Sequence, residues 1–134
     1  MFPTEVRFRD LDALGHVNNA VYLTYLESAR IAWWLELTGR SGLGGMDIIL
    51  ARVELDYRSP VVYGDRLDVS ARCLSFRRSS FVLVQSINEH GSGRLVADAR
   101  KVLVHYDFAK RQATPIPPAM RLVLRDSGAV EEAS

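Results

Sequence analysis

A cluster of polar residues lies near the start of the chain, directly before a long apolar segment. Its members are Asp10, Asp12, His16, Asn18 and Asn19. Considered singly, each has a structural explanation, because an asparagine can cap a helix and an aspartate can form an Asx turn. By the same reasoning His16 is more often a hydrogen-bonded loop residue than a catalyst. Asp12, however, lies several residues upstream of the first helical turn, so helix capping does not explain it.

A carboxylate near the start of a helix has a clear chemical use. The positive field of the helix N-terminus keeps it ionised. The same terminus has backbone N–H groups that can hold a carbonyl oxygen as negative charge develops on it. A carboxylate and oxyanion donors are the minimum for acyl transfer. The sequence has no Ser-His-Asp or Cys-His signal, no glycine-rich phosphate loop and no metal-ligand spacing, so Asp12 is the best candidate nucleophile or general base.

The helix that would position this cluster is expected over residues 20–37. Apolar side chains cover most of its circumference, and Thr24, Glu27 and Ser28 leave only a narrow polar stripe. A helix that is apolar on nearly every side must be surrounded by other elements rather than laid on a surface. Glu27 and Arg30 are expected to form a structural pair beside the polar stripe.

Most of the remaining chain has the alternating pattern of β-strands. The expected strands cover residues 5–9, 49–59, 66–76, 81–87 and 94–108. The last strand changes the phase of its alternation, which predicts a β-bulge near Arg100. Strands joined by turns favour an antiparallel sheet, and an apolar helix fits only inside the curve of such a sheet. The sequence therefore predicts an α+β fold in which the sheet wraps around one long helix.

The chain is expected to form one domain over residues 1–125. Its 134 residues suffice for one continuous core, and 48% hydrophobic with 25% charged residues is an ordinary globular composition. The segment "TPIPPAM" (114–120) is expected to end regular structure, and residues 126–134 are expected to be a disordered tail. One sheet covers the helix from one side only, which predicts that two chains pair.

Charge and cysteine content narrow the possible partners and location. The formal net charge of +1 leaves no electrostatic footprint for nucleic acid or an anionic membrane. No apolar run reaches membrane-spanning length, and the start of the chain lacks a signal-peptide pattern. Cys73 is the only cysteine, so an intrachain disulfide cannot form. These features indicate a cytoplasmic protein without nucleic-acid or membrane partners.

Three segments of the chain resemble a known enzyme family. The segment "RFRDLDALGHVNNAVYLTYLESAR" (7–30) is similar to the signature of hotdog-fold acyl-CoA thioesterases of the 4-hydroxybenzoyl-CoA thioesterase class. The likeness continues in "ARVELDYRSPVVYGDRLDV" (51–69) and "SFRRSSFVL" (75–83). It implies the hotdog fold, a five- or six-stranded antiparallel sheet wrapped around one long helix. It also implies a homodimer or homotetramer with active sites at the subunit interface.

The resemblance implies roles for single residues. The second aspartate of the family's D-x-D motif is the catalytic carboxylate, which corresponds to Asp12. The oxyanion donor is a backbone N–H at the start of the long helix, by position near Asn19. "HVNN" is closer to long- and medium-chain acyl thioesterases than to the hydroxybenzoyl type, which brings His16 and Asn18 into the candidate site. Tyr22, in the first helical turn, is expected to contact the substrate.

Two arginines are expected to bind the carrier of the acyl group. Arg77 and Arg78 fall in a turn between two strands, where related thioesterases grip the nucleotide phosphates of CoA. Without the resemblance they would be ordinary solvated charges of a hairpin.

The expected reaction is hydrolysis of an acyl-CoA thioester to the acid and free CoA, with no cofactor and no metal. Asp12 would either attack the carbonyl directly or activate a water as general base. Two alternatives stay open: a non-catalytic acyl-CoA-binding hotdog protein, and a hotdog dehydratase of 3-hydroxyacyl thioesters. The dehydratase would need a catalytic histidine, and His16 is the only histidine near the helix. The identity of the acyl chain also stays open, as does the carrier, which is either CoA or an acyl carrier protein.

Overall fold

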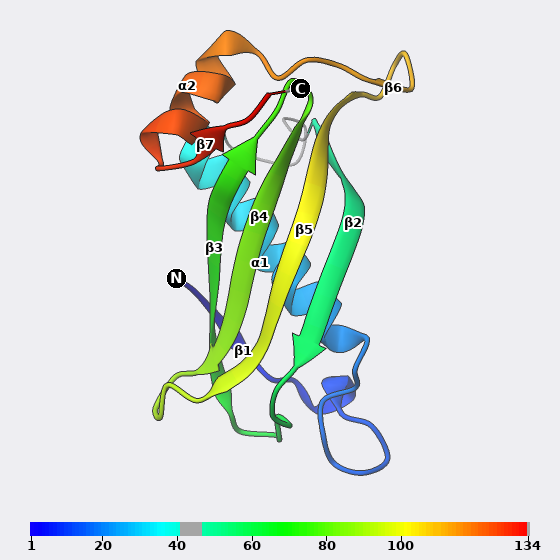
Figure 1. Ribbon diagram of the computed structural model, residues 1–134. Helices are drawn as coiled ribbons and strands as arrows, with labels where there is room; N and C mark the ends of the chain where they lie inside the picture. Colours follow the sequence, from blue (N-terminus) through cyan, green and yellow to red (C-terminus); the bar gives the residue numbers. More distant parts are fainter. Residues whose placement is uncertain (41–46, 134) are drawn as a thin grey trace. The chain divides into compact units, whose positions relative to one another are not determined.

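The computed structural model describes residues 1–40 and 47–133 of the chain. The elements, in chain order, are β1 (Phe2–Glu5), a 3-10 helix η1 (Phe8–Asp10), α1 (Val21–Thr38), β2 (Ile48–Tyr57), β3 (Arg66–Phe76), β4 (Ser80–Glu89), β5 (Leu95–Asp107), β6 (Gln112–Ala113), α2 (Pro118–Asp126) and β7 (Val130–Glu131). The strands form a sheet in the order β1-β3-β4-β5-β2 (Figure 1). The pairs β1–β3 and β5–β6 are antiparallel, and β7 adds to β3 in parallel. No helix among the described residues is long and apolar enough to cross a membrane.

The chain divides into two compact units. The first comprises Met1–Trp33, Leu55–Ala71 and Gln85–Ala99, and the second comprises Trp34–Glu54, Arg72–Val84 and Arg100–Ser134.

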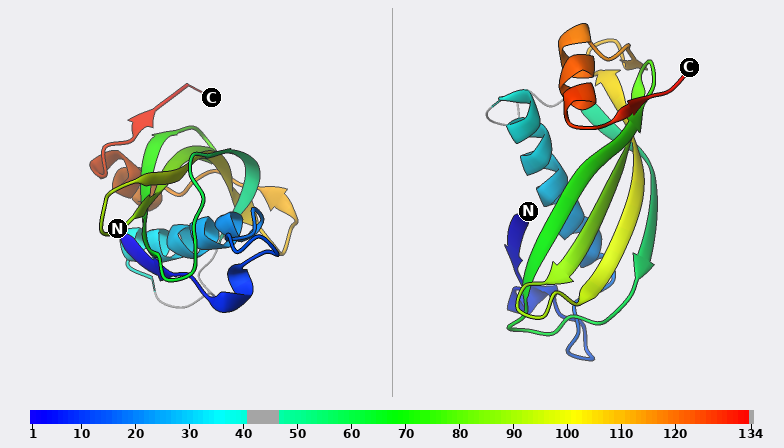
Figure 2. Two further views of the ribbon diagram at one scale, coloured as in Figure 1. Left: turned by 90° about the horizontal axis from the view of Figure 1, so that it is seen from below. Right: turned by 60° about the vertical axis from the view of Figure 1, so that its left-hand side comes forward.

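The first unit is built on the N-terminal part of α1, which lies against one face of the sheet (Figure 2). Tyr22, Tyr25, Leu26 and Ala29 are buried at helical spacing against residues of β3, β4 and β5. Full burial of a side chain such as Leu26 contributes roughly 2 kcal/mol. The buried amide of Gln85 donates from its Nε2 to the carbonyl of Leu26 over 3.0 Å, which fixes β4 to the helix.

The outer face of α1 in this unit is not covered by residues that the structure describes. Leu23 is 40% exposed, and Thr24, Glu27 and Ser28 are exposed with it. Glu27 and Arg30 do not form a close ion pair among the described residues, although the charge of Glu27 acts on Arg30; Arg30 is buried. Its Nε and Nη1 atoms are buried without a hydrogen-bond partner in the described chain, and this burial lowers the pKa of the guanidinium.

The second unit has an aromatic and polar interior. Trp34 stacks on Phe81 with ring centroids 5.4 Å apart. The carboxylate of Asp47 accepts hydrogen bonds from the Trp34 indole over 3.3 Å and pairs with Arg40 over 3.0 Å. Its second oxygen lies 3.0 Å from Nε2 of His105 on β5. The start of β2 is therefore tied to α1 and β5 through one carboxylate.

The helix and four strands predicted over 20–37, 49–59, 66–76, 81–87 and 94–108 are confirmed as α1, β2, β3, β4 and β5. The strand predicted over 5–9 is wrong: Phe8–Asp10 is a 3-10 turn, and β1 precedes it. The carboxylate of Asp10 accepts the backbone N–H of Arg7 over 2.9 Å, and the N–H of Asp10 donates to the Arg7 carbonyl over 2.9 Å. These short-range hydrogen bonds favour a turn over an extended strand.

The bulge predicted near Arg100 is also wrong. Burial in β5 alternates without interruption from Ala97 through Ala99 and Lys101 to Leu103. Lys101 is only 2% exposed and lies at an inward position of the strand. The sequence pattern would instead place a polar residue on the outer face. The change of phase in the sequence therefore marks a buried lysine, and the strand itself is continuous.

The C-terminal segment has more regular structure than the sequence predicts. Beyond "TPIPPAM", α2 begins at Pro118 and buries Met120 and Leu124. Residues 126–134, expected to be a disordered tail, contain β7, in which Val130 pairs with Ser75 of β3. Glu131 binds two arginines of α2. Burial of α2 and these ion pairs supply the contacts that hold this segment.

Candidate active site

The polar cluster forms a closed loop in the first unit. A bridge between Leu11 and Val17 joins its two ends. The N–H of Asp12 donates to the His16 carbonyl over 2.7 Å, and the N–H of Gly15 donates to the Asp12 carbonyl over 3.1 Å. Gly15 has a φ of 81°, a conformation that side chains other than glycine's strain to adopt. The sequence places glycine where the loop reverses.

The Asp12 carboxylate divides its two oxygens between structure and solvent. Oδ1 accepts the backbone N–H of Leu14 over 2.9 Å and that of His16 over 3.3 Å. Oδ2 forms no hydrogen bond with any described residue, and the side chain is exposed. The Asx-turn interpretation of Asp12 is therefore confirmed. It leaves one oxygen available for chemistry.

Asp10 holds this loop to the helix from inside. It is 3% exposed and accepts the Tyr25 hydroxyl on Oδ2 over 2.7 Å. Arg7 donates to it from the backbone and from Nη2. Burial acts to raise the pKa of Asp10, but the hydrogen bonds from Tyr25 and Arg7 outweigh it and hold this pKa below the usual value. Asp10 is thus ionised and holds the loop to the helix. The sequence alone does not show which of the two aspartates has this structural role.

The start of α1 is fixed by the two asparagines. Oδ1 of Asn18 accepts the N–H of Ala20 over 2.9 Å, and the Asn18 carbonyl accepts the N–H of Val21 over 2.9 Å. Asn18 therefore holds the turn that leads into α1, which begins at Val21. The carbonyl of Asn19 accepts the Tyr57 hydroxyl over 2.7 Å. The backbone N–H of Asn19 has no hydrogen-bond partner in the part of the chain that is described.

A cleft of about 410 Å³ opens beside this loop. It is lined by Asp12, Leu14, His16, Val17, Asn19, Tyr22, Tyr57, Arg58, Ser59 and Pro60. Of the residues predicted for the site, the cleft brings together Asp12, His16, Asn19 and Tyr22, whereas Asn18 is not among its lining residues. Burial raises the pKa of the Tyr22 phenol above its ordinary value. The lining of the cleft thus includes the carboxylate residue Asp12, Asn19, two tyrosines and the apolar residues Leu14, Val17 and Pro60.

The residues Tyr57 to Pro60 of this cleft are missing from the sequence prediction of the site. Tyr57 is the last residue of β2, and the other three residues follow it in the turn. The alternating pattern of the sequence assigns Tyr57 only to one face of that strand. The signal that could have found them is the run "DYRSP", in which a strand stops beside an aromatic residue, an arginine and a proline.

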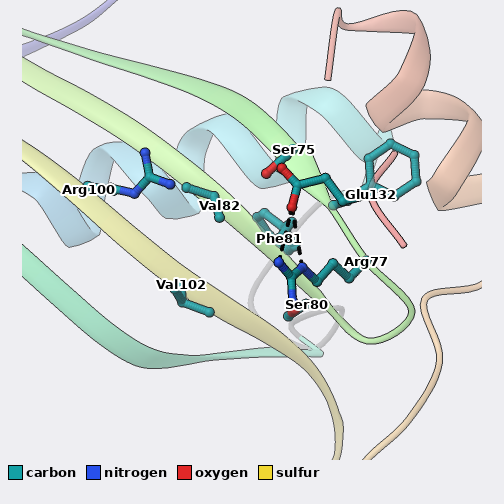
Figure 3. Close-up of a pocket in the computed structure, with 9 residues that line it drawn as sticks. Ser75, Arg77, Ser80, Phe81, Val82, Arg100, Val102 and Glu132 are labelled. Atoms are coloured by element: carbon teal, nitrogen blue, oxygen red, sulfur yellow. Dashed lines mark hydrogen bonds and ion pairs between the residues drawn. The ribbon is translucent and has the colours of Figure 1, made fainter. Parts of the chain in front are cut away.

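Arg77 and Arg78 belong to the second unit and do not line this cleft. Arg77 lines another cavity, of about 220 Å³, together with Phe76, Phe81, Val82, Arg100, Val102 and Glu132, among others (Figure 3). Its Nε and Nη2 both donate to one oxygen of Glu132 over 3.3 Å. The backbone carbonyl of Arg78 accepts the N–H of Ile116 over 2.8 Å. The hairpin is therefore an anchoring point for the C-terminal segment.

Several known proteins are similar to this chain in sequence and fold. The family model of the thioesterase-like superfamily matches residues 6–124. The long-chain acyl-CoA thioesterase FadM of Escherichia coli is 30% identical over 122 residues, which are 87% of this chain and 90% of that protein. A 1,4-dihydroxy-2-naphthoyl-CoA hydrolase of Synechococcus elongatus is 27% identical over 125 residues, which are 90% of each chain. A Thermus thermophilus thioesterase, crystallised with coenzyme A and zinc, superposes with a TM-score of 0.82 at 36% identity and covers 93% of this chain and 91% of that one. The chain therefore belongs to the thioesterase-like superfamily and is a thioester hydrolase with the hotdog fold.

Proposed function

We propose that this enzyme is an acyl-CoA thioesterase that uses Asp12 as nucleophile or general base. The observation that carries the proposal is the cleft of the first unit, which both Asp12 and Asn19 line. Oδ2 of Asp12 and the backbone N–H of Asn19 have no hydrogen-bond partner among the described residues. A thioester carbonyl held against that N–H would be polarised, and negative charge on its oxygen would be stabilised as the tetrahedral intermediate forms.

Two routes lead to the same products. In the first, Oδ2 of Asp12 attacks the carbonyl carbon, the C–S bond breaks and CoA leaves as a thiolate that takes up a proton. Water then hydrolyses the mixed anhydride and restores the carboxylate. In the second, Asp12 accepts a proton from water, the hydroxide attacks the carbonyl, and the same C–S bond breaks. In both routes one thioester and one water give one carboxylic acid and one CoA thiol.

His16 and Asn18 have supporting roles in this proposal. His16 donates its backbone N–H to Asp12 and its side chain lines the cleft, beside the place of the thioester or the attacking water. Asn18 acts through the turn, because its side chain holds the N–H of Ala20 that follows the oxyanion donor. Tyr22 would contact the acyl group from the apolar side of the cleft.

The acyl group and its carrier are the finer part of the proposal. The two named relatives act on a long-chain acyl-CoA and on a bicyclic aromatic acyl-CoA, so both classes belong in the first substrate panel. We assign the CoA phosphates to Arg77 and Arg78, since a guanidinium binds phosphate with charge-assisted hydrogen bonds. We further propose a cytoplasmic homodimer or homotetramer with the active site at the subunit interface. The uncovered face of α1 supports such an assembly.

The test is thiol release from a panel of aliphatic and aromatic acyl-CoAs. We expect Asp12→Asn to lower kcat by roughly a hundredfold or more, the usual scale for losing a positioned base or nucleophile. The melting temperature should change little, because the amide oxygen of asparagine can still accept the two N–H groups that Oδ1 accepts. Asp126→Asn, at an exposed position of α2, serves as the matched control.

Near-wild-type turnover by purified Asp12→Asn would remove Asp12 from the mechanism. If the wild type binds acyl-CoA but releases no thiol from any of the substrates, the non-catalytic binding protein becomes the better assignment.

A further inference from the structure

Tyr57 anchors the peptide next to the proposed oxyanion donor. Its hydroxyl donates to the carbonyl of Asn19 over 2.7 Å, across 38 positions of sequence. The other end of the same peptide group, the N–H of Ala20, donates to Oδ1 of Asn18 over 2.9 Å. The peptide that follows Asn19 is therefore held at both its polar ends.

The peptide that precedes Asn19 has one bonded end. Its carbonyl, on Asn18, accepts the N–H of Val21 over 2.9 Å, whereas its N–H, on Asn19, has no partner among the described residues. The peptide before it is held too, because the N–H of Asn18 donates to the Asp10 carbonyl over 2.8 Å. With both neighbouring peptides held, the direction of the Asn19 N–H is restricted as well. Without the hydroxyl of Tyr57, the peptide after Asn19 would keep only its bond from the Ala20 N–H to Asn18, and the adjoining N–H of Asn19 would be held less strictly in one direction.

The Tyr57 ring is itself held beside the cleft. It ends β2, lines the cleft, and packs edge-on against Tyr22 with ring centroids 5.0 Å apart and an angle of 89° between the planes. Because Tyr22 is buried in the first turn of α1, the hydroxyl of Tyr57 reaches the turn from a fixed base. The hydroxyl also offsets part of the negative partial charge on this carbonyl oxygen, which would otherwise repel negative charge developing nearby.

We propose that Tyr57 is a positioning residue for the oxyanion-donating turn of this enzyme. The inference rests on the proposed function and adds to it a group from a distant strand. An oxyanion donor contributes more in the transition state than with the bound substrate, so a loss of its direction should lower kcat and leave KM nearly unchanged. A hydroxyl that contacted the substrate directly, with equal strength before and during reaction, would raise KM instead.

The experiment compares Tyr57→Phe with Tyr63→Phe. The first removes only the hydroxyl and keeps the ring against Tyr22. The second makes the same change at an exposed tyrosine of the same unit that does not line the cleft. We expect Tyr57→Phe to lower kcat roughly five- to tenfold, the scale of one neutral hydrogen bond, with KM within twofold. Tyr63→Phe should match the wild type in both constants.

Amide hydrogen exchange gives a readout independent of catalysis. The N–H of Ala20 should exchange faster in Tyr57→Phe than in the wild type or in Tyr63→Phe, because its peptide loses one of two anchors. Adding Asn18→Ala, which removes the second anchor, should lower kcat by less than the product of the two single effects.

The inference is overturned if an active enzyme keeps its kcat after Tyr57→Phe, if the loss lies in KM, or if exchange at Ala20 is unchanged. A wild type that hydrolyses no thioester refutes the proposed function, and the role of Tyr57 fails with it. The wild-type rate thus tests the function, and the ratio of variant to wild type tests Tyr57.

Discussion

At the scale of single residues, the two aspartates of the D-x-D motif are separated by their surroundings. Asp10 is buried, with its carboxylate taken up by Tyr25 and Arg7, whereas Asp12 is exposed and keeps Oδ2 unbonded among the described residues. The sequence alone shows two carboxylates two positions apart and cannot show which one turns inward. The partner that decides it, Tyr25, lies 15 positions away along the chain.

The two arginines of the β3–β4 hairpin give a prediction about the carrier. The CoA phosphates are remote from the scissile bond, so a contact to them should stabilise ground state and transition state equally. We expect Arg77→Ala with Arg78→Ala to raise KM for acyl-CoA roughly tenfold at low salt and less at high salt, with little change in kcat. Hydrolysis of the matching acyl-N-acetylcysteamine, which lacks phosphates, should be unaffected.

Glu132 provides the control for this experiment. Arg77 binds Glu132 in the chain itself, so the double variant also removes an ion pair. Glu132→Gln removes the same pair and keeps both arginines. If Glu132→Gln reproduces the rise in KM, the arginines serve to hold the C-terminal segment and CoA is bound elsewhere. Equal losses with both substrates would lead to the same conclusion.

At the scale of elements, the parts with strong periodicity could be predicted and the parts held by distant contacts could not. The helix α1 and the strands β2 to β5 follow from apolar spacing. The 3-10 turn at Phe8–Asp10 is closed by hydrogen bonds between Asp10 and Arg7, and Tyr25 also binds the Asp10 carboxylate; alternation reports neither contact. A signal for α2 was present, since a proline begins it and Met120 and Leu124 are one turn apart. The partner strand of β7 could not be read from the sequence.

The candidate site was predicted to a similar extent. One sequence motif includes Asp12, His16, Asn19 and Tyr22, because these residues lie close together along the chain. Tyr57 reaches the turn from the end of β2, and only the fold brings it there.

The turn that precedes α1 gives a prediction about acid stability. The pKa of Asp10 is lower in the folded protein than in the unfolded chain. The ionised carboxylate therefore contributes to the free energy of unfolding above the unfolded pKa, and this contribution is lost as the pH falls through the folded pKa. Asp10→Asn should lower the free energy of unfolding by about 2 kcal/mol at neutral pH, the scale of hydrogen bonds to a buried charged group. As pH falls below the ordinary aspartate pKa of 3.8, the difference from the wild type should shrink.

Urea unfolding followed across this pH range checks the prediction, with Asp126→Asn as the control at an exposed aspartate. A difference that stays constant from neutral to acidic pH would show that the asparagine acts through packing and that the charge of Asp10 contributes nothing.

At the scale of the whole molecule, apolar residues are exposed on a strand at the end of the sheet. Among the described strands, β2 stands at one end of the strand order, next to β5 (Figure 1). All residues from Leu50 to Glu54 are exposed, so neither face of this stretch is covered. Leu50 is 43% and Val53 36% exposed. A long edge strand with open apolar faces is a template for pairing with another chain.

We therefore expect sedimentation at low micromolar concentration to give a dimer or tetramer, with β2 at the contact between subunits. Val53→Lys places a charge on that edge strand and should shift the protein toward the monomer. Leu122→Lys, at a 53% exposed position of α2, should leave the assembly unchanged. Because we propose that the active site lies at the interface, the rate of thiol release per chain should fall as Val53→Lys is diluted and should recover at higher protein concentration. A compact wild-type monomer with full activity would contradict both the assembly and the shared site, and an unchanged assembly in Val53→Lys would move the contact away from β2.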